Sequence, residues 1–145
     1  SSTKQFPVYF ITICTKKRDK HLIVPHISDA IEGFFGNSEK TYGWQIGRYV
    51  IMPDHIHFFC SPISEELPLS DFIGRFKTWT TKVAKENGCG AKLWQREFFD
   101  HILRSGESYS KKWEYVRLNP VRAGLCQRPE EWKHQGEISI IERIG

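Results

Sequence analysis

Residues 43–61 have the sequence GWQIGRYVIMPDHIHFFCS, which predicts two neighbouring strands joined by a tight turn. The first part, residues 43–52, is rich in β-branched and aromatic residues, which favour extended backbone. Pro53 and Asp54 interrupt this run, and residues 55–61 form a second extended segment. A two-residue break between two such segments is typical of a β-hairpin.

The rest of the chain supplies elements that can surround this hairpin. Hydrophobic spacing and breaking residues predict a strand at 7–15, a helix at 28–35, a helix at 70–87, a strand at 94–104 and a helix at 105–119. The order is the βαββαβ pattern of the ferredoxin-like fold, followed by an added C-terminal helix. We therefore predict an α+β domain with the helices of the βαββαβ unit on one face of its sheet.

Capping and breaking residues set the expected helix ends. Ser28 and Ser70 are candidate N-caps, and Gly36 and Gly88 are candidate stop signals. The second helix is expected to face the core with a stripe of apolar residues at helical spacing, namely Phe72, Phe76, Trp79 and Val83.

The 145 residues fit one domain, 1–145, with its core at about 7–125 and a C-terminal extension, 126–145, whose role is unassigned. No apolar run reaches the length of a membrane span, so we expect no membrane partner. The four cysteines are scattered, without a Cys-x-x-Cys pair. This pattern suits a reducing compartment, and we expect a cytoplasmic protein.

The net charge of +4 is unevenly distributed along the chain. Residues 70–128 hold twelve Lys and Arg against six Asp and Glu, whereas residues 1–69 hold seven of each. A basic, aromatic-rich segment can bind a nucleic acid through phosphate contacts and base stacking, although it also fits a solvated helix face. The candidate DNA-contacting side chains are Arg75, Lys82, Lys85, Arg96, His101, Lys111 and Lys112.

The second strand of the hairpin carries a possible metal site. His55 and His57 are two residues apart, so their side chains project from the same face of a strand, while Ile56 points into the core. Two imidazoles on one face can bind one metal ion, but such a pair can also be structural. Asp54 could orient a ligand histidine or simply occupy the turn beside Pro53.

The last predicted helix places a tyrosine on a polar face. Tyr109, Trp113 and Val116 form its apolar stripe, and Tyr115 lies about 130° from the centre of that stripe. Asn119, four residues later, is expected to share the face of Tyr115. A tyrosine in this position is often an ordinary surface residue, and Asn before Pro often simply ends a helix.

Together, these groups fit one reaction, the attack of a tyrosine on a phosphodiester. A divalent cation polarises the phosphate and neutralises developing charge. Mg²⁺ or Mn²⁺ suits a site with two imidazoles and one amide oxygen. Lys111 and Lys112 would favour loss of the phenol proton from Tyr115, and no general base is evident. A phosphotyrosine stores the energy of the broken bond, so nicking and rejoining needs no nucleotide. The lack of a Gly-rich phosphate loop in the sequence is consistent with this.

Three segments resemble the REP-associated tyrosine transposases, within the single-tyrosine HUH transposases of bacterial insertion sequences. They are MPDHIH at 52–57, LWQREFFDH at 93–101 and YVRLNPVRAGL at 115–125. The resemblance implies a ferredoxin-like domain that cuts single-stranded DNA near a hairpin of a palindromic repeat. The products would be a 5′-phosphotyrosine and a free 3′-hydroxyl.

The resemblance also implies roles for individual residues. His55 and His57 would be metal ligands, Tyr115 the nucleophile, and Asn119 the third ligand, where insertion-sequence relatives carry glutamine. The protein would act as a monomer or a homodimer.

Three alternatives remain open from the sequence. A replication-initiator or relaxase-like nicking enzyme would use similar chemistry, although no helicase segment is present. A non-catalytic nucleic-acid-binding module would use the basic faces and leave Tyr115 dispensable. A zinc hydrolase is disfavoured because the histidine pair has no evident third strong ligand or carboxylate base.

Overall fold

The computed structural model describes residues 6–89 and 92–141. Its elements in chain order are β1 (Val8–Cys14), η1 (Lys16–Arg18), α1 (Pro25–Tyr42), β2 (Trp44–Ile51), β3 (His55–Pro62), α2 (Leu69–Glu86), β4 (Phe99–Leu103), α3 (Gly106–Val116), α4 (Asn119–Arg122), η2 (Pro129–Glu131) and β5 (Gln135–Glu137). The order of the first seven principal elements, from β1 to α3, is the one that the sequence predicts.

The sheet has five strands in the order β4-β1-β3-β2-β5, and every neighbouring pair is antiparallel. The predicted hairpin is present, since β2 pairs with β3 and Ile51 lies opposite Ile56. The ferredoxin-like α+β prediction is confirmed.

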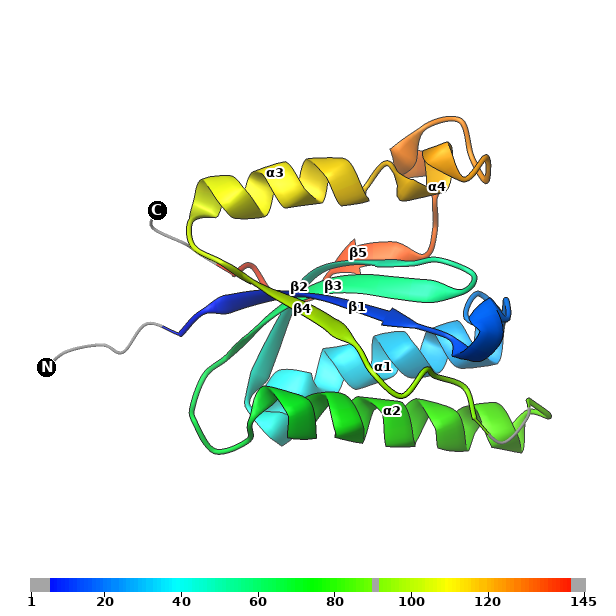
Figure 1. Cartoon of the computed structure of the whole chain (residues 1–145), viewed down its shortest axis with the longest axis horizontal. Helices are drawn as coiled ribbons and strands as arrows, with labels where there is room; N and C mark the ends of the chain where they lie inside the picture. The colour runs from blue at the N-terminus through cyan, green and yellow to red at the C-terminus, as the bar shows by residue number, and fades with distance from the viewer. Residues whose placement is uncertain (1–5, 90–91, 142–145) are drawn as a thin grey trace, which may run out of the picture.

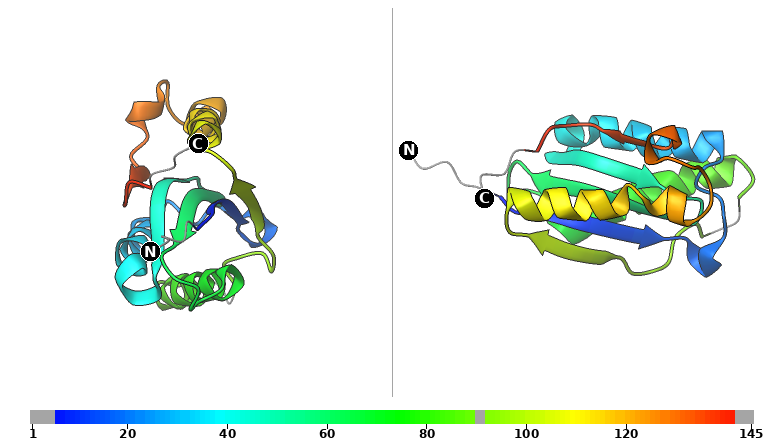
Figure 2. Two further views of the ribbon diagram at one scale, coloured as in Figure 1. Left: turned by 90° about the vertical axis from the view of Figure 1, so that its left-hand side faces the viewer. Right: turned by 90° about the horizontal axis from the view of Figure 1, so that it is seen from above.

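The two faces of the sheet are covered differently (Figures 1 and 2). α1 and α2 lie side by side under one face, and α3 with the C-terminal segment lies over the other. Alternation along β3 explains the division, because Ile56 and Phe58 are fully buried in the core beneath the helices. Phe59 points to the opposite face, where its ring stacks on Tyr109 of α3.

α1 is longer than the predicted helix 28–35. It begins with Pro25 at its first position and ends at Tyr42, where Gly43 adopts a left-handed conformation with φ of 72°. Ser28 is not the N-cap, because it lies inside the first turn of α1. Its hydroxyl donates to the carbonyl of Pro25. Gly36 lies exposed inside the helix, where packing of the opposite face outweighs its low helix propensity.

α2 matches the predicted range within one residue at each end, but Pro68 replaces Ser70 as the N-cap. The predicted stripe is wrong at Trp79, whose side chain is 45% exposed. The stripe instead continues through Thr80 and Ala84, which are fully buried. Thr80 can be buried because its hydroxyl donates to the carbonyl of Phe76 and accepts from the indole of Trp94.

The predicted strand 94–104 is shorter in the structure, where β4 covers only Phe99–Leu103. Trp94 forms an isolated bridge with Thr15, and no strand spans the residues between Trp94 and β4. The predicted final helix is also divided: α3 ends at Val116, and Asn119 begins the separate helix α4. Pro120 explains why α3 ends at Val116, because proline has no N–H to donate to the carbonyl four residues earlier and its ring would clash with that carbonyl.

The C-terminal segment beyond 125 extends the sheet. β5 pairs with the outer side of β2, and the indole of Trp132 donates to the carbonyl of Ile51 at 3.0 Å. This strand was not predicted, because Gln-Gly-Glu carries no strand-forming pattern. In the described part of the chain, no helix is both long and apolar enough to cross a membrane.

Candidate active site

The predicted histidine pair lies on the face of β3 that looks toward α3. The centroids of the His55 and His57 rings are 4.8 Å apart, and the rings are nearly perpendicular. Both residues are partly exposed, whereas Ile56 between them is fully buried. The predicted placement of the two rings on one face is therefore confirmed.

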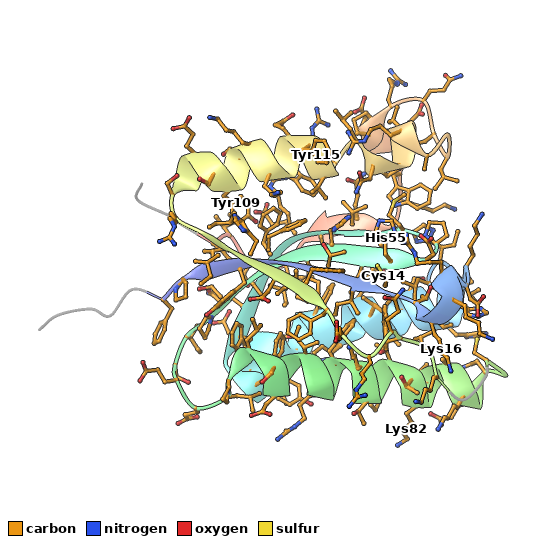
Figure 3. All side chains as sticks on the ribbon, viewed as in Figure 1. Cys14, Lys16, His55, Lys82, Tyr109 and Tyr115 are labelled. Carbon is orange, nitrogen blue, oxygen red and sulfur yellow. The ribbon has the colours of Figure 1, made fainter. Side chains whose placement is uncertain are left out.

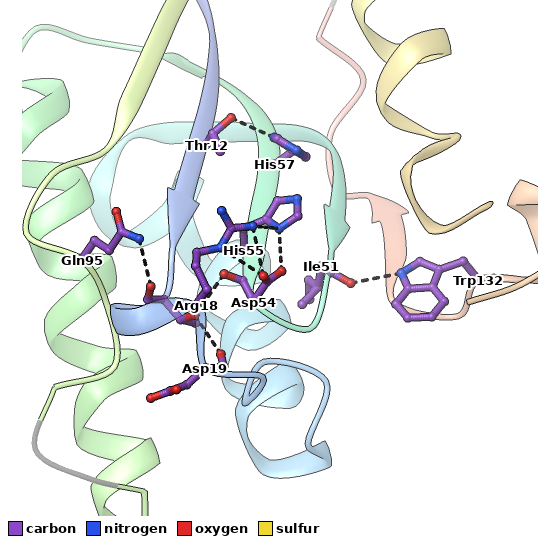
Figure 4. Close-up of polar contacts among 10 residues, drawn as sticks. Thr12, Arg18, Asp19, Ile51, Asp54, His55, His57, Gln95 and Trp132 are labelled. Carbon is purple, nitrogen blue, oxygen red and sulfur yellow. Dashed lines mark hydrogen bonds and ion pairs between the residues drawn. The ribbon is translucent and has the colours of Figure 1, made fainter. Parts of the chain in front are cut away.

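Each imidazole is held through its Nδ1 atom (Figure 4). His57 Nδ1 lies 2.8 Å from the hydroxyl of Thr12, which is its direct partner across the β1–β3 ladder. His55 Nδ1 lies 2.8 Å from a carboxylate oxygen of Asp54, which can only accept, so Nδ1 carries the proton. Both contacts leave Nε2 for a ligand, which is how histidines that bind metals are usually oriented.

Asp54 therefore combines the two roles considered for it, since it occupies the hairpin turn and also orients His55. Arg18 forms an ion pair with its other carboxylate oxygen at 3.0 Å. Partial burial opposes ionisation of Asp54, but the hydrogen bond and charge of His55 and the charge of Arg18 hold its pKa below the ordinary value. The carboxylate is thus ionised at neutral pH.

The backbone that presents Arg18 adopts an unusual conformation. Lys17 and Arg18 both have positive φ, 58° and 56°, which is uncommon for residues with a side chain. Hydrogen bonds fix this turn, because the hydroxyl of Thr15 donates to the carbonyls of Asp19 and Asp54. Such local strain tends to occur at functional sites.

His57 is a neutral base at physiological pH. Burial lowers the pKa of His57 to about 3, and the positive charges of His55, Lys112, Arg122 and Arg18 act in the same direction. Cations from α3 and α4 therefore lie close enough to the imidazole to influence it. A neutral imidazole is the form that binds a metal.

α3 is fixed to the strands that carry the histidines. Tyr109 stacks on Phe59 with centroids 4.1 Å apart, and Trp113 contacts the same ring edge-on. The ring of Phe10 stacks on His57, and the ammonium of Lys112 lies 5.2 Å from the centroid of Phe10. The apolar stripe predicted for this helix is confirmed.

Tyr115 lies on the exposed side of α3, with 65% of its surface accessible (Figure 3). The guanidinium of Arg122 covers its ring at 4.1 Å and donates to its backbone carbonyl. The same guanidinium donates to the amide oxygen of Asn119. Arg122 thus joins Tyr115 and Asn119 across the break between α3 and α4.

The structure corrects one part of the predicted constellation. Asn119 does not continue the helix of Tyr115, and its oxygen already accepts from Arg122. Among the described residues, no hydrogen bond or ring contact joins Tyr115 or Asn119 to His55 or His57, and no three His, Cys, Asp or Glu side chains form a metal cluster. In two of the three proposed ligands, the histidines, the side-chain hydrogen bonds are made through Nδ1 and leave Nε2 for a ligand.

The predicted DNA-contacting residues fall into separate regions. Lys82, Lys85 and Arg96 line one groove beside α2, on the side of the molecule away from α3. Arg75, which is also on α2, lies near the ring of Tyr42 at the end of α1. The other three lie nearer the histidine face: Lys111 pairs with Glu107, Lys112 lies over Phe10, and His101 is exposed on β4 opposite Phe10.

Three contributors to the site were missed by the sequence reasoning: Thr12, Arg18 and Arg122. Arg122 was detectable in principle, since it follows Asn119 by three residues and a helical turn brings them together. Thr12 and Arg18 are separated from their histidine-side partners by 45 and 36 residues. Only the strand register and the loop conformation reveal those two contacts.

The chain is similar to several known proteins. The family model described as transposase IS200 like matches residues 6–117. An uncharacterized protein of Haemophilus influenzae is 29% identical and covers 78% of this chain and 79% of its own length. A REP-associated tyrosine transposase of Escherichia coli K12 is 28% identical over 61% of this chain and 52% of its own length.

A solved structure also shares the fold. The structure of a REP-associated tyrosine transposase bound to a REP hairpin superposes with a TM-score of 0.74 at 16% identity. The match covers 100% of this chain and 96% of that one.

Proposed function

Because the chain belongs to the IS200-like transposase family, we propose that it nicks and transfers single-stranded DNA near a hairpin with Tyr115 as the nucleophile. The observation that carries this proposal is the orientation of the histidine pair. Both imidazoles are held at Nδ1, with Nε2 left free, on the face of the sheet that α3 covers. This orientation suits histidines that bind a cation to polarise a phosphodiester better than it suits a purely structural pair.

The reaction is a phosphoryl transfer to tyrosine. The phenol oxygen of Tyr115 forms a bond to phosphorus as its proton is released, and the bond from phosphorus to the 3′ oxygen breaks. The products are a 5′-phosphotyrosine and a DNA strand with a protonated 3′-hydroxyl. A DNA 3′-hydroxyl can later attack the phosphotyrosine and release Tyr115, so strand transfer needs no nucleotide.

The residues around the phenol favour this attack. Tyr115 is exposed, so a DNA strand can reach it, and the Arg122 guanidinium lies against its ring. A positive charge beside the ring can stabilise the negative charge that develops as the phenol oxygen attacks. Lys111, one turn before Tyr115, carries its charge on the exposed surface of α3 but is already paired with Glu107.

His55 and His57 would hold a divalent cation, Mg²⁺ or Mn²⁺, through Nε2. When bound, such a cation polarises the phosphate and neutralises its developing charge. Asn119 would join the two histidines as the third ligand after Arg122 releases its amide oxygen. Arg122 would then be free to contact the phosphate, since a guanidinium binds phosphate through two parallel hydrogen bonds.

The proposed partner is a single-stranded DNA hairpin of a palindromic repeat, bound by a monomer or a homodimer. The superposable transposase is described with a REP hairpin, and the proposal extends that kind of partner to this chain. A binding module without catalysis would use the same surface but would not need an exposed tyrosine beside an arginine.

The test is covalent capture of end-labelled DNA. The protein is incubated with a hairpin oligonucleotide that carries single-stranded flanks, in Mg²⁺ or Mn²⁺, and resolved on a denaturing gel. We expect a protein–DNA adduct that EDTA prevents and that Tyr115→Phe eliminates.

The matched control is Tyr42→Phe, which removes a phenol hydroxyl that accepts or donates no hydrogen bond among the described contacts. It should form the adduct normally. Binding without an adduct in either metal would support the non-catalytic module, and an adduct that survives Tyr115→Phe would place the nucleophile elsewhere.

A further inference from the structure

A second basic surface lies on the other side of the sheet from α3. It is a groove of about 930 Å³ between the C-terminal half of α2 and the segment 92–96, with Lys16 of η1 at one end. Figure 3 shows Lys16 and Lys82 at the same end of the molecule as His55. Six cationic side chains line the groove: Lys16, Lys77, Lys82, Lys85, Lys92 and Arg96.

Lys77 has a structural task in this groove. Its ammonium donates to the carbonyls of Gln95, Arg96 and Glu97 at 3.0, 3.0 and 3.3 Å, which uses all three of its protons. Burial lowers its pKa, while the charge of Glu97 acts in the opposite direction. Lys77 thus fixes the segment after Trp94 against α2 and shapes the groove.

The other five cations are exposed and available to a ligand. Within residues 6–89 and 92–141, no acidic side chain forms an ion pair with them, although Glu86 also lines the groove. Thr78 and Thr81 add hydroxyl donors along the α2 wall. Since residues three and four apart share a helix face, these threonines lie on the same face of α2 as Lys82 and Lys85 and form a single track with them.

The floor of the groove is apolar and closed to base recognition. Leu93 and Trp94 are buried, and the indole N–H of Trp94 is used by Thr80. Gln95 donates its amide to the carbonyl of Thr15. Apart from Glu86, the charged and hydroxyl groups along the groove are therefore lysine, arginine and threonine donors, which suit phosphate oxygens.

The groove leads to the histidine site. Lys16 at its end is two residues before Arg18, which is paired with Asp54 beside His55. Backbone hydrogen bonds fix this corner, since the amide of Lys16 donates to the carbonyl of Leu93. A polyanion lying in the groove would thus reach η1, where the guanidinium of Arg18 lies 3.3 Å from His55 Nδ1.

We propose that this groove holds the backbone of the single-stranded DNA that flanks the hairpin, and so delivers the strand to the histidine site. This inference rests on the proposed nicking function. The occupant is a single strand because the ligating groups form one narrow track beside one helix. The groove adds affinity for any flanking sequence and leaves hairpin recognition to other surfaces.

The salt dependence of DNA affinity should report how many phosphates the groove contacts. Each phosphate contact to a single strand contributes about 0.7 to the slope of log affinity against log salt. Removing two of the five free cations should therefore make that slope shallower by about 1.4. Base sequence in the flank should not alter this change.

The experiment measures affinity for three DNA probes by fluorescence anisotropy at several salt concentrations. The probes are a bare hairpin, the hairpin with a 5′ single-stranded tail, and the hairpin with a 3′ tail. The test variant is K82Q/K85Q, and the matched control is K40Q/K133Q, which removes two exposed charges outside the groove. All proteins also carry Tyr115→Phe, so that binding is measured without chemistry.

We expect one tail to increase affinity, and K82Q/K85Q to abolish that increase and flatten its salt slope while binding the bare hairpin normally. The control variant should keep the increase. A tail effect that survives in K82Q/K85Q, or no tail effect at all, overturns the groove assignment. Failure of the nicking function is recognised separately, because it removes the covalent adduct of the protein with an intact Tyr115.

Discussion

The two faces of the sheet differ in how completely they are covered. Beneath α1 and α2, aromatic side chains fill the space, for example Phe35 and Phe76, which stack with centroids 5.5 Å apart and are at most 1% exposed. On the α3 face, one helix covers part of the strands, and His55 and His57 stay partly accessible. Stability and chemistry are therefore expected to reside on opposite faces of the same strands.

Replacement of His57, a proposed metal ligand, should have the largest effect on the open face. His57→Ala should reduce nicking by on the order of 10³-fold or more, because metal assistance contributes several kcal/mol to such a transfer. Hairpin affinity and the thermal unfolding midpoint should stay close to those of the unsubstituted protein, since His57 is outside the helix-covered core. Single-turnover nicking, anisotropy and calorimetry measure the three quantities.

A large loss of hairpin affinity in His57→Ala would show that the imidazole holds the DNA or the fold instead. Thr12→Val offers a milder version of the same test. It removes only the hydroxyl bonded to Nδ1, so the ring remains with its orientation less well fixed.

Replacement of a core aromatic tests the covered face. Phe76→Ala should lower the free energy of unfolding by about 3–5 kcal/mol, the range for deleting a buried phenylalanine. Phe76 is fully buried and contacts the rings of Phe34, Phe35, Phe58 and Trp94. Denaturant unfolding measures the loss.

The matched variant for this test is Phe99→Ala, because Phe99 is 70% exposed on the edge strand β4. Its unfolding free energy should change by less than about 0.5 kcal/mol. Nicking per folded molecule should persist in Phe76→Ala at low temperature. If both variants lost equal stability, the proposed division between the faces would be wrong.

Asp54 lies at the boundary between the two faces, as a turn residue whose carboxylate also holds His55, a proposed metal ligand. Asp54→Asn should weaken metal-dependent nicking by about 10–100-fold, the usual cost of losing a partner that orients a ligand histidine. The Mn²⁺ concentration for half-maximal nicking should rise accordingly. Asp19→Asn, at an acidic residue just after η1 whose carboxylate pairs with His21, should leave that concentration unchanged.

Gly47 tests how closely α3 must sit on the sheet. A Cβ atom at this position would lie 2.5 Å from the hydroxyl oxygen of Tyr109, which accepts a hydrogen bond from the amide of Arg48. Gly47→Ala should therefore cost about 1–3 kcal/mol through overpacking. In the double variant with Tyr109→Phe, which removes the clashing oxygen, part of that loss should be recovered.

If the two substitutions were simply additive in a double-mutant cycle, the hydroxyl would not be the clashing group. Nicking by Gly47→Ala reports the second consequence. Because Tyr115 is carried on α3, movement of the helix should lower the rate even where the protein remains folded.

The features that sequence predicted well are those set by local periodicity. The period of two along β3 placed His55 and His57 together, and the helical period identified Trp113 and Val116 as buried or packed. The hairpin followed from a short break between two extended runs. These patterns need no knowledge of the rest of the chain.

The features that sequence missed depend on long-range placement or on competing local signals. Thr12 contacts His57 only through the β1–β3 register, and the positive φ of Arg18 has no signature in an ordinary basic residue. Helical spacing predicts Asn119 on the helix of Tyr115, whereas α3 already ends at Val116, three residues earlier. The same kind of spacing predicts Trp79 in the core, but Thr80 is the buried residue there.

Substitution of Trp132 should have the smallest and most local effect on the two faces of the sheet. Trp132 anchors the segment beyond α4 to the edge of β2 that pairs with β5. Its indole donates to the carbonyl of Ile51, and its ring packs with Val50 and Met52. Trp132→Phe should lower the unfolding free energy by about 1 kcal/mol, since it leaves that carbonyl without this donor while an aromatic ring remains. Hydrogen exchange at the amides paired with β5 should accelerate, whereas exchange in α1 should not change. Equal acceleration in α1 would mean that the C-terminal segment stabilises the covered face as well, and the two faces would then unfold as one unit.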